Sequence, residues 1–282
     1  MITIVKAEFV SRSLLQCLTK KTFTGSVVGI YQDFCNILGN DGHIITISIA
    51  PIGKSPFSVL IPRQNLKSSI IAKMNVRADP CGINVGNKIL IILDKAETWD
   101  PKMLQFPDSF CLKVSSVKLL FDSTKWFESN AKNSNDKYVI EKLISGANEL
   151  QNALAKRRSI KKSVTYLAGL GFGLTPSGDD YLLGVMASLW ITKNTHPLDE
   201  IARISSQKTT SLSAAYLIAA SKGDFAECWH DLVRSILNQN PKNLRDSISK
   251  FMQIGASSGQ DALAGFSTQI LKSNINLEIL RD

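Results

Sequence analysis

The chain has 282 residues, is 44% hydrophobic and has a mean hydropathy near zero, so it can bury the core of one large domain or two ordinary ones. Its 33 basic and 24 acidic residues give a net charge of +9, which favours anionic partners, although no dense Lys/Arg stripe with interleaved aromatic residues indicates a nucleic-acid interface. No run approaches the roughly 18 apolar residues of a membrane span, and five scattered cysteines without a Cys-x-x-Cys pair favour reduced thiols in the cytoplasm over a zinc or disulfide site.

Residues 1–127 are expected to form a β-rich domain. Short runs of β-branched and aromatic residues alternate there with Gly and Pro, a pattern typical of a small barrel or sandwich. The Asn40-Asp41-Gly42 turn between two such runs predicts a hairpin. Strands are expected at 25–31, 34–38, 44–49, 57–61, 88–93 and 110–114, with a helix over 13–18.

A polar stretch that begins at Glu128 is expected to be an exposed connection between domains. After it, apolar residues recur at helical spacing, first at Tyr138, Ile140 and Leu143. The sequence therefore predicts an α+β protein, in which a barrel-like or sandwich-like N-terminal domain is followed by a mainly α-helical domain over 136–282.

The helical domain uses one phrase twice. The segments 177–184 and 258–265 both read Ser-Gly-x-Asp-x-Leu-x-Gly, and Ser followed three residues later by Asp is close to a capping box at a helix start. A third hydroxyl-rich segment, 209–213, also precedes an apolar run. Because helix N-termini attract anions and glycine lets backbone N–H groups approach a ligand, these segments predict one pocket for an anion of modest size, such as a phosphate or a carboxylate.

The aspartates of these phrases leave alternatives open, because carboxylates repel an anion unless they are otherwise engaged. Asp180 and Asp261 could cap their own helices and leave Asp179 free. Alternatively, an Asp from each phrase could share a Mg²⁺ ion that bridges to the ligand. Capping is the favoured use, and no residue is assigned as a metal ligand. Helix capping alone would explain either phrase by itself, but the recurrence of the whole eight-residue pattern favours a functional site.

Other familiar site patterns are absent or weak. Gly169-x-Gly171-x-Gly173 differs from the Gly-x-Gly-x-x-Gly dinucleotide fingerprint, and no phosphate-binding Gly-x-x-x-x-Gly-Lys-Ser/Thr loop occurs. The three histidines stand apart from these segments, so nothing in the sequence indicates a Ser-His-Asp or Cys-His arrangement.

The residues Gly173-Leu174-Thr175-Pro176-Ser177-Gly178-Asp179-Asp180, with Thr209-Thr210-x-x-Ser213 and the second phrase, resemble a bacterial family associated with the small subunit of oxamate carbamoyltransferase. The resemblance covers about residues 165–270. It implies phosphorolysis of oxalurate to oxamate and carbamoyl phosphate, in purine and allantoin breakdown, together with other enzyme subunits. The chain lacks the Ser-Thr-Arg-Thr-Arg loop of the aspartate and ornithine carbamoyltransferases, so carbamoyl transfer here would use a different construction.

The resemblance also implies which residues form the site. Asp179 and Asp180 are expected to be catalytic, with Asp179 orienting the carbamoyl nitrogen or a metal, while backbone N–H groups of the glycines and the hydroxyl groups hold the anion. The expected ligand-binding residues are Gly173, Thr175, Ser177, Gly178, Thr209, Thr210, Ser213, Ser258, Gly259 and Asp261. The alternative from another class is a non-catalytic subunit that binds a metabolite or scaffolds a multi-subunit enzyme.

Overall fold

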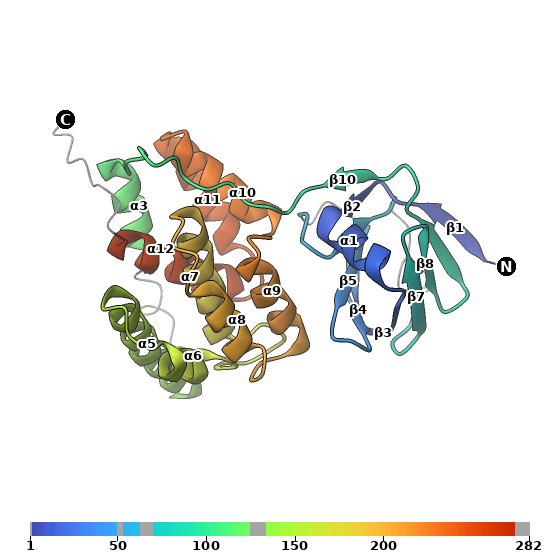
Figure 1. The fold of residues 1–282 in the computed structure, drawn as a ribbon, viewed down its shortest axis with the longest axis horizontal. Helices are drawn as coiled ribbons and strands as arrows, with labels where there is room; N and C mark the ends of the chain where they lie inside the picture. Colours follow the sequence, from blue (N-terminus) through green and yellow to red (C-terminus); the bar gives the residue numbers. More distant parts are fainter. Residues whose placement is uncertain (1, 50–52, 63–69, 125–133, 274–282) are drawn as a thin grey trace. The chain divides into compact units, whose positions relative to one another are not determined.

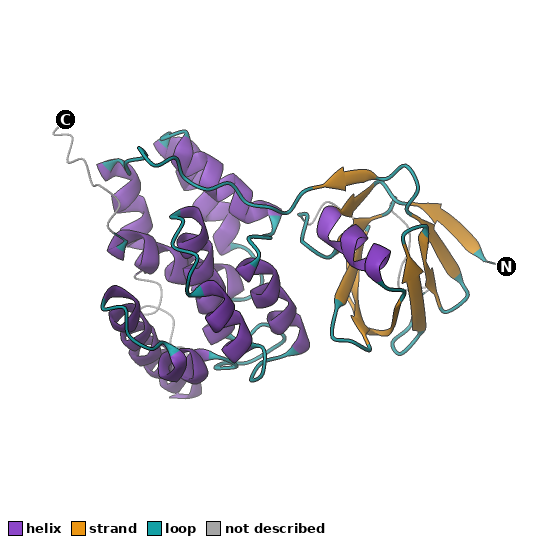
Figure 2. Cartoon of the chain, viewed as in Figure 1, coloured by secondary structure: helices purple, strands orange, loops and turns teal. Residues whose placement is uncertain are grey.

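The computed structural model describes residues 2–49, 53–62, 70–124 and 134–273 (Figures 1 and 2). The chain divides into two compact units, Met1–Lys102 and Met103–Asp282, each with its own hydrophobic core. The first unit is built on a β-sheet and the second on helices, so the predicted α+β class is confirmed. The connection expected from residue 128 falls mainly on 125–133, which lie outside the described residues.

One sheet with ten described strands forms the first unit, in the order β1-β9-β8-β7-β3-β4-β5-β6-β2-β10. Helix α1 (Arg12–Lys20) follows β2 directly and buries Leu14 and Leu18. The strands are β1 (Thr3–Lys6), β2 (Phe9–Ser11), β3 (Phe23–Ile30), β4 (Phe34–Gly39), β5 (Ile44–Ser48), β6 (Ser58–Leu60), β7 (Asn75–Asp79), β8 (Gly82–Val85), β9 (Ile89–Ile92) and β10 (Glu97–Trp99).

The sheet curls until its two ends approach each other. Strand β1 stands at one end of the strand order and pairs with β9, whereas the next strand along the chain, β2, lies near the other end between β6 and β10. At the step between them, the Ala7 N–H donates to the Ile92 carbonyl at 2.9 Å and the Glu8 N–H to the Leu60 carbonyl at 2.8 Å. The result is the barrel-like alternative of the prediction.

Most of the expected elements of this unit are present, and one is wrong. Helix α1 and strands β3, β4, β5, β6 and β9 lie where the sequence predicts them. Residues 110–113 are irregular and lead into helix α3 (Val114–Thr124). Phe110 and Leu112 are apolar because they pack in the helical core, and this burial was misread as a strand signal. Strand β7 was missed because its exposed residues are polar and only Val76 and Ala78 are buried.

The second unit is helical in all its described regular elements. Its central helix is α7, which buries side chains on every side and packs against α12, α9, α8 and α6 (Figure 1). The helices are α3, α5 (Ser134–Ala155), α6 (Lys161–Leu167), α7 (Ser177–Ile191), α8 (Leu198–Ser205), α9 (Ser211–Ser221), α10 (Glu227–Leu237), α11 (Pro241–Met252) and α12 (Ser258–Lys272).

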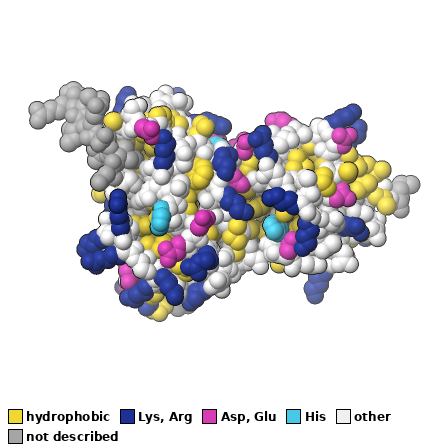
Figure 3. Space-filling view, viewed as in Figure 1, with side chains coloured by type: hydrophobic (Ala, Val, Ile, Leu, Met, Phe, Trp, Pro, Cys, Tyr) yellow, Lys and Arg dark blue, Asp and Glu magenta, His cyan; other side chains and the backbone are white. Residues whose placement is uncertain are grey.

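The surface is mixed in charge. Lys and Arg side chains are interspersed with Asp and Glu on the face shown in Figure 3. Among the described residues, no helix combines the length and the apolar character that crossing a membrane requires.

Candidate functional site

The two copies of the Ser-Gly-x-Asp-x-Leu-x-Gly phrase begin α7 and α12, and these helices run in the same direction against each other. Their contact is reciprocal. A Cβ atom at Gly184 would lie 1.8 Å from the Ala262 carbonyl oxygen, and one at Gly265 would lie 2.0 Å from the Tyr181 carbonyl oxygen. Only glycine permits backbones to approach this closely, so the last glycine of each phrase sets the contact between the helices.

The segments before the two helices are also equivalent. The Gly178 N–H donates to the Leu170 carbonyl at 2.8 Å, and the Gly259 N–H donates to the Ile254 carbonyl at 3.0 Å. A Cβ at either glycine would lie within 2.0 Å of a carbonyl oxygen of the preceding helix, α6 or α11. The pairs α6–α7 and α11–α12 thus form an internal repeat related by an approximate two-fold axis. The expectation that Gly178 and Gly259 present backbone donors to a ligand is therefore wrong.

The serines and aspartates of the phrases exchange partners across this axis. The Asp180 carboxyl of α7 lies near the hydroxyls of Ser258 and Thr175, and the Asp261 carboxyl of α12 lies near those of Ser177 and Ser257, where these hydroxyls lower the carboxyl pKa values. The Thr175 and Ser258 hydroxyl oxygens lie 2.9 Å apart. The predicted capping boxes are therefore wrong. Ser177 and Ser258 are the first residues inside their helices, and the N-cap residues before them, Pro176 and Ser257, make no side-chain cap bond.

Asp179 joins a third segment to the pair. One of its carboxylate oxygens accepts from the Gly169 N–H at 3.0 Å, and the other accepts from the Thr209 hydroxyl. The hydroxyl of Thr210 donates to the Leu174 carbonyl at 2.5 Å and caps α9 by accepting from the Ser213 N–H at 3.2 Å. Asp179 is thus engaged within the protein rather than free.

These bonds bring together all three hydroxyl-bearing segments that the sequence singled out. The side chains of Thr175, Ser177 and Ser258 are partly exposed, whereas Ser213 and the three aspartates are buried. The glycine-bearing loop before α7 reaches solvent: a Cβ atom at Gly173 would meet nothing within 4 Å, and Phe172 is 72% exposed. The two cavities described for the structure are lined by other residues.

Burial raises the pKa values of all three carboxyls. Burial raises the pKa of Asp261 to about 6, against the hydrogen bonds from Ser177 and Ser257 that lower it. Burial also raises the pKa of Asp180 well above its ordinary value, and the charges of Asp261 and Asp179 raise it further. For Asp179, burial raises the pKa against hydrogen bonds from Thr209, Gly169 and Ser213. Each of Asp180 and Asp261 keeps one buried oxygen, Oδ2, without a hydrogen-bond partner.

A shared Mg²⁺ was one alternative for these aspartates. Mg²⁺ prefers near-octahedral oxygen coordination with several waters. Among the residues that the structure describes, no group of three or more His, Cys, Asp or Glu side chains is arranged to hold a metal ion.

Two members of the cluster were not among the expected site residues. Gly169 contributes its N–H and Leu174 its carbonyl oxygen. Backbone groups carry no residue-type signal, so side-chain patterns could not reveal them. The glycine-rich stretch 169–173 was the available indication that backbone geometry matters here.

Comparison with known families matches both units of the chain. Residues 167–270 match the family model AllH, oxamate carbamoyltransferase subunit AllH, and residues 5–98 match the model of the AllH family N-terminal domain. No solved structure matches the chain. The first match runs from the end of α6 through α7, α8, α9, α10 and α11 to near the end of α12, and the second spans most of the curled sheet. The chain therefore belongs to the AllH family of oxamate carbamoyltransferase subunits.

Proposed function

We propose that this subunit binds oxamate and oxalurate where α7 and α12 begin and takes part there in the phosphorolysis of oxalurate. Phosphate oxygen attacks the carbamoyl carbon, the bond from that carbon to the amide nitrogen breaks, and the nitrogen takes up a proton as oxamate leaves. The products are oxamate and carbamoyl phosphate. Membership of the family supports the reaction, and other subunits of the enzyme complete the site.

The observation that carries the site is the exchanged pairing of Asp180 and Asp261, which leaves one unpaired, buried Oδ2 oxygen on each repeat. Oxamate is a small planar molecule with a carboxylate at one end and a carboxamide at the other, so its outline has an approximate two-fold axis like that of the site. Its amide N–H groups are donors for carboxyl oxygens that lack them, since a buried acceptor without a partner costs about 1–3 kcal/mol. The positive ends of two helix dipoles favour its negative charge.

Asp180 is suited to supply the proton that the leaving nitrogen requires. A carboxyl whose pKa is raised by burial holds its proton nearer to neutral pH, as general acids do. The partly exposed hydroxyls of Thr175 and Ser258 lie between solvent and this carboxyl, so they rotate aside when substrate enters. Asp179 acts as a positioning residue, because its oxygens already hold Gly169 and Thr209.

The test is turnover of the reassembled enzyme, with all subunits, measured as carbamoyl phosphate formed from oxalurate and phosphate. Asp180→Asn is expected to lower kcat by about 100-fold or more, with a correctly folded subunit and retained assembly. The matched control is Asp246→Asn, on the exposed side of α11, which should leave the rate unchanged. Full activity of the Asp180→Asn enzyme would remove this residue from the chemistry.

A non-catalytic scaffold role is the second candidate, because the Thr175 and Ser258 hydroxyls bond each other and the glycines serve helix packing. Thermal denaturation of the purified chain separates the two. A ligand at 100 times its dissociation constant stabilises by roughly 2.7 kcal/mol, so oxamate, oxalurate, phosphate and carbamoyl phosphate should include at least one that raises Tm. No shift with any of them supports the scaffold.

A further inference from the structure

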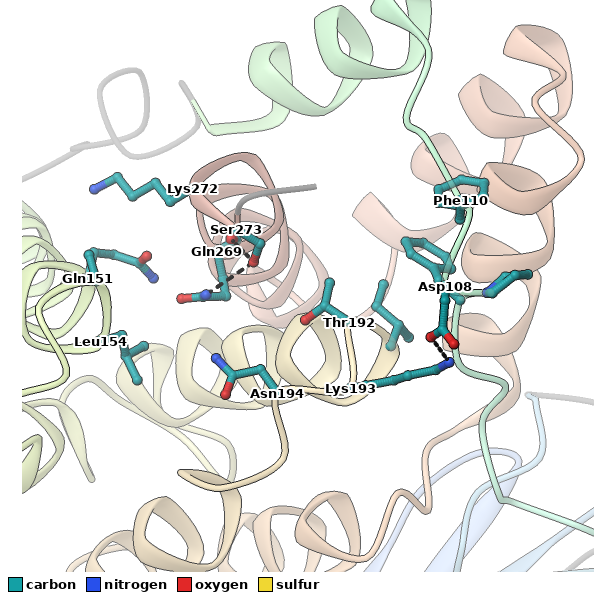
Figure 4. A pocket seen from close by; sticks show the side chains of 14 residues that line it. Asp108, Phe110, Gln151, Leu154, Thr192, Lys193, Asn194, Gln269, Lys272 and Ser273 are labelled. Atoms are coloured by element: carbon teal, nitrogen blue, oxygen red, sulfur yellow. Dashed lines mark hydrogen bonds and ion pairs between the residues drawn. The ribbon is translucent and has the colours of Figure 1, made fainter. Parts of the chain in front are cut away.

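A cavity of about 450 Å³ lies at the other ends of α7 and α12, remote from the repeated phrases. The last turns of α5, α7 and α12 and the segment 106–110 line it (Figure 4). Side-chain amides of Gln151, Asn194 and Gln269 project into it, with Lys272 at its edge. Nothing in the proposed reaction uses these residues.

Gln269 is the strongest indication that the cavity takes a ligand. Gln269 is only 6% exposed, and its side-chain amide nitrogen donates to the Ser273 hydroxyl at 3.4 Å. That bond turns Oε1 toward the space in front of α5, where the structure gives it no hydrogen-bond partner (Figure 4). A buried carbonyl oxygen without a donor is available to accept a hydrogen bond from a group bound in the cavity.

The charges around the cavity select the class of occupant. Three helix C-termini meet here, and the negative ends of their dipoles favour a positively charged group near Gln269. Lys272 offers an ammonium group to an anion, while Lys193, the second lysine among the described lining residues, is paired with Asp108. Leu154 and Phe106 add apolar surface. The lining thus offers Gln269 as an acceptor for a cationic group and Lys272 as a partner for an anionic group. Leu154 and Phe106 provide a surface for an apolar group.

We propose that this cavity binds a small zwitterion of the α-amino acid class. Its ammonium group donates to Oε1 of Gln269 at the helix C-termini, its carboxylate pairs with Lys272, and its side chain lies against Leu154 and Phe106. Because the site stands at the C-terminal ends of the two helices whose N-termini carry the repeated phrases, occupancy would stabilise the same helix pair.

The experiment is calorimetric titration of the full chain with the common L-α-amino acids, each compared with its decarboxylated amine and its deaminated acid. At least one amino acid is expected to bind, with both truncated analogues weaker by about tenfold or more, since a hydrogen bond to a charged group is lost in each. Absence of binding by every amino acid, or equal binding of an analogue, overturns the proposal.

Two variants locate the binding. Lys272→Met and Gln269→Leu should each weaken the amino acid about tenfold or more, whereas Lys250→Met, an exposed lysine in the last turn of α11, is the matched control and should not. Should Gln269→Leu fail to fold, Gln269→Glu supplies the measurement: the added carboxylate should tighten the binding of the amine analogue. Affinities unchanged in Lys272→Met and in the folded Gln269 variant would overturn the site.

Discussion

At the scale of single residues, the main feature of the site is three aspartates whose pKa values are raised by burial. Each aspartate has a defined set of donors, and at least one donor of each comes from another segment of the chain. The residue types were predictable from the repeated phrase. Their partners were not, because a capping box within one helix and an exchange between two helices require the same Ser and Asp at the same spacing.

The buried Asp261 should make the stability of the chain depend on pH. Its pKa of about 6 in the folded protein lies above the unfolded value of about 3.9, so the native state binds more protons between these values and stability falls as pH rises through the window. Asp261→Asn removes this loss and should stabilise the chain by about 1–3 kcal/mol at pH 8, with the gain vanishing near pH 4. Urea unfolding at pH 4, 6 and 8 measures it, with Asp246→Asn as control; a gain that is constant with pH would contradict the burial argument.

Asp179 should matter to folding as well as to the site. Replacing it by Asn leaves one acceptor oxygen where two donors, the Gly169 N–H and the Thr209 hydroxyl, now bond. The expected loss in free energy of unfolding is about 1–3 kcal/mol. Urea unfolding of Thr209→Val provides the comparison, since it removes only one of the two bonds and should cost less. Wild-type stability of Asp179→Asn would show that these bonds contribute nothing.

At the scale of elements, the helix pair α7–α12 was predictable as two helices but not as one contact. Both phrases contain a glycine after the apolar positions, and the structure shows that this glycine serves the other helix. The distance between the phrases along the chain hides this relation. The β-unit shows the complementary limit: runs rich in apolar residues predicted β4 and β5, whereas β7 alternates exposed with buried residues, β10 has no buried residue, and neither was predicted.

Gly184→Ala tests that contact. The added methyl group would meet the Ala262 carbonyl at 1.8 Å, so the helices must separate, and the cost should be about 3 kcal/mol or more. Gly146→Ala in α5 is the matched control, because there the methyl group meets side-chain atoms of Leu167 and Tyr166 at 2.8 Å rather than a backbone carbonyl, so it should cost less than Gly184→Ala. Thermal and urea unfolding report both. Equal effects of the two substitutions would argue against a backbone contact.

At the scale of the whole molecule, two cores stand in one chain. The apolar cluster of the first unit contains only residues up to Ala96, and that of the second begins at Met103. The sequence predicted the order of a β-rich and a helical part. Segment 103–124 belongs by its contacts to the helical unit, which local pattern could not show because packing of α3 against α12 is a long-range property.

Separate cores predict separate folding. A fragment covering 103–282 is expected to give a helical circular dichroism spectrum and a single cooperative unfolding transition without the first unit. The fragment 1–102 should likewise unfold cooperatively with a β-type spectrum. A fragment 103–282 that lacks a cooperative transition would show that its core depends on residues before Met103.

The exchange of serine and aspartate partners has a consequence for how the protein can change over time. A solitary α6–α7 unit would present an unmatched serine and an unmatched aspartate, and two such units on different polypeptides would complete each other as an isologous dimer does. This chain holds that self-complementary association within one polypeptide. A substitution at a serine or aspartate of one repeat must therefore be compensated at its partner in the other repeat. The two repeats are thus expected to change together in evolution.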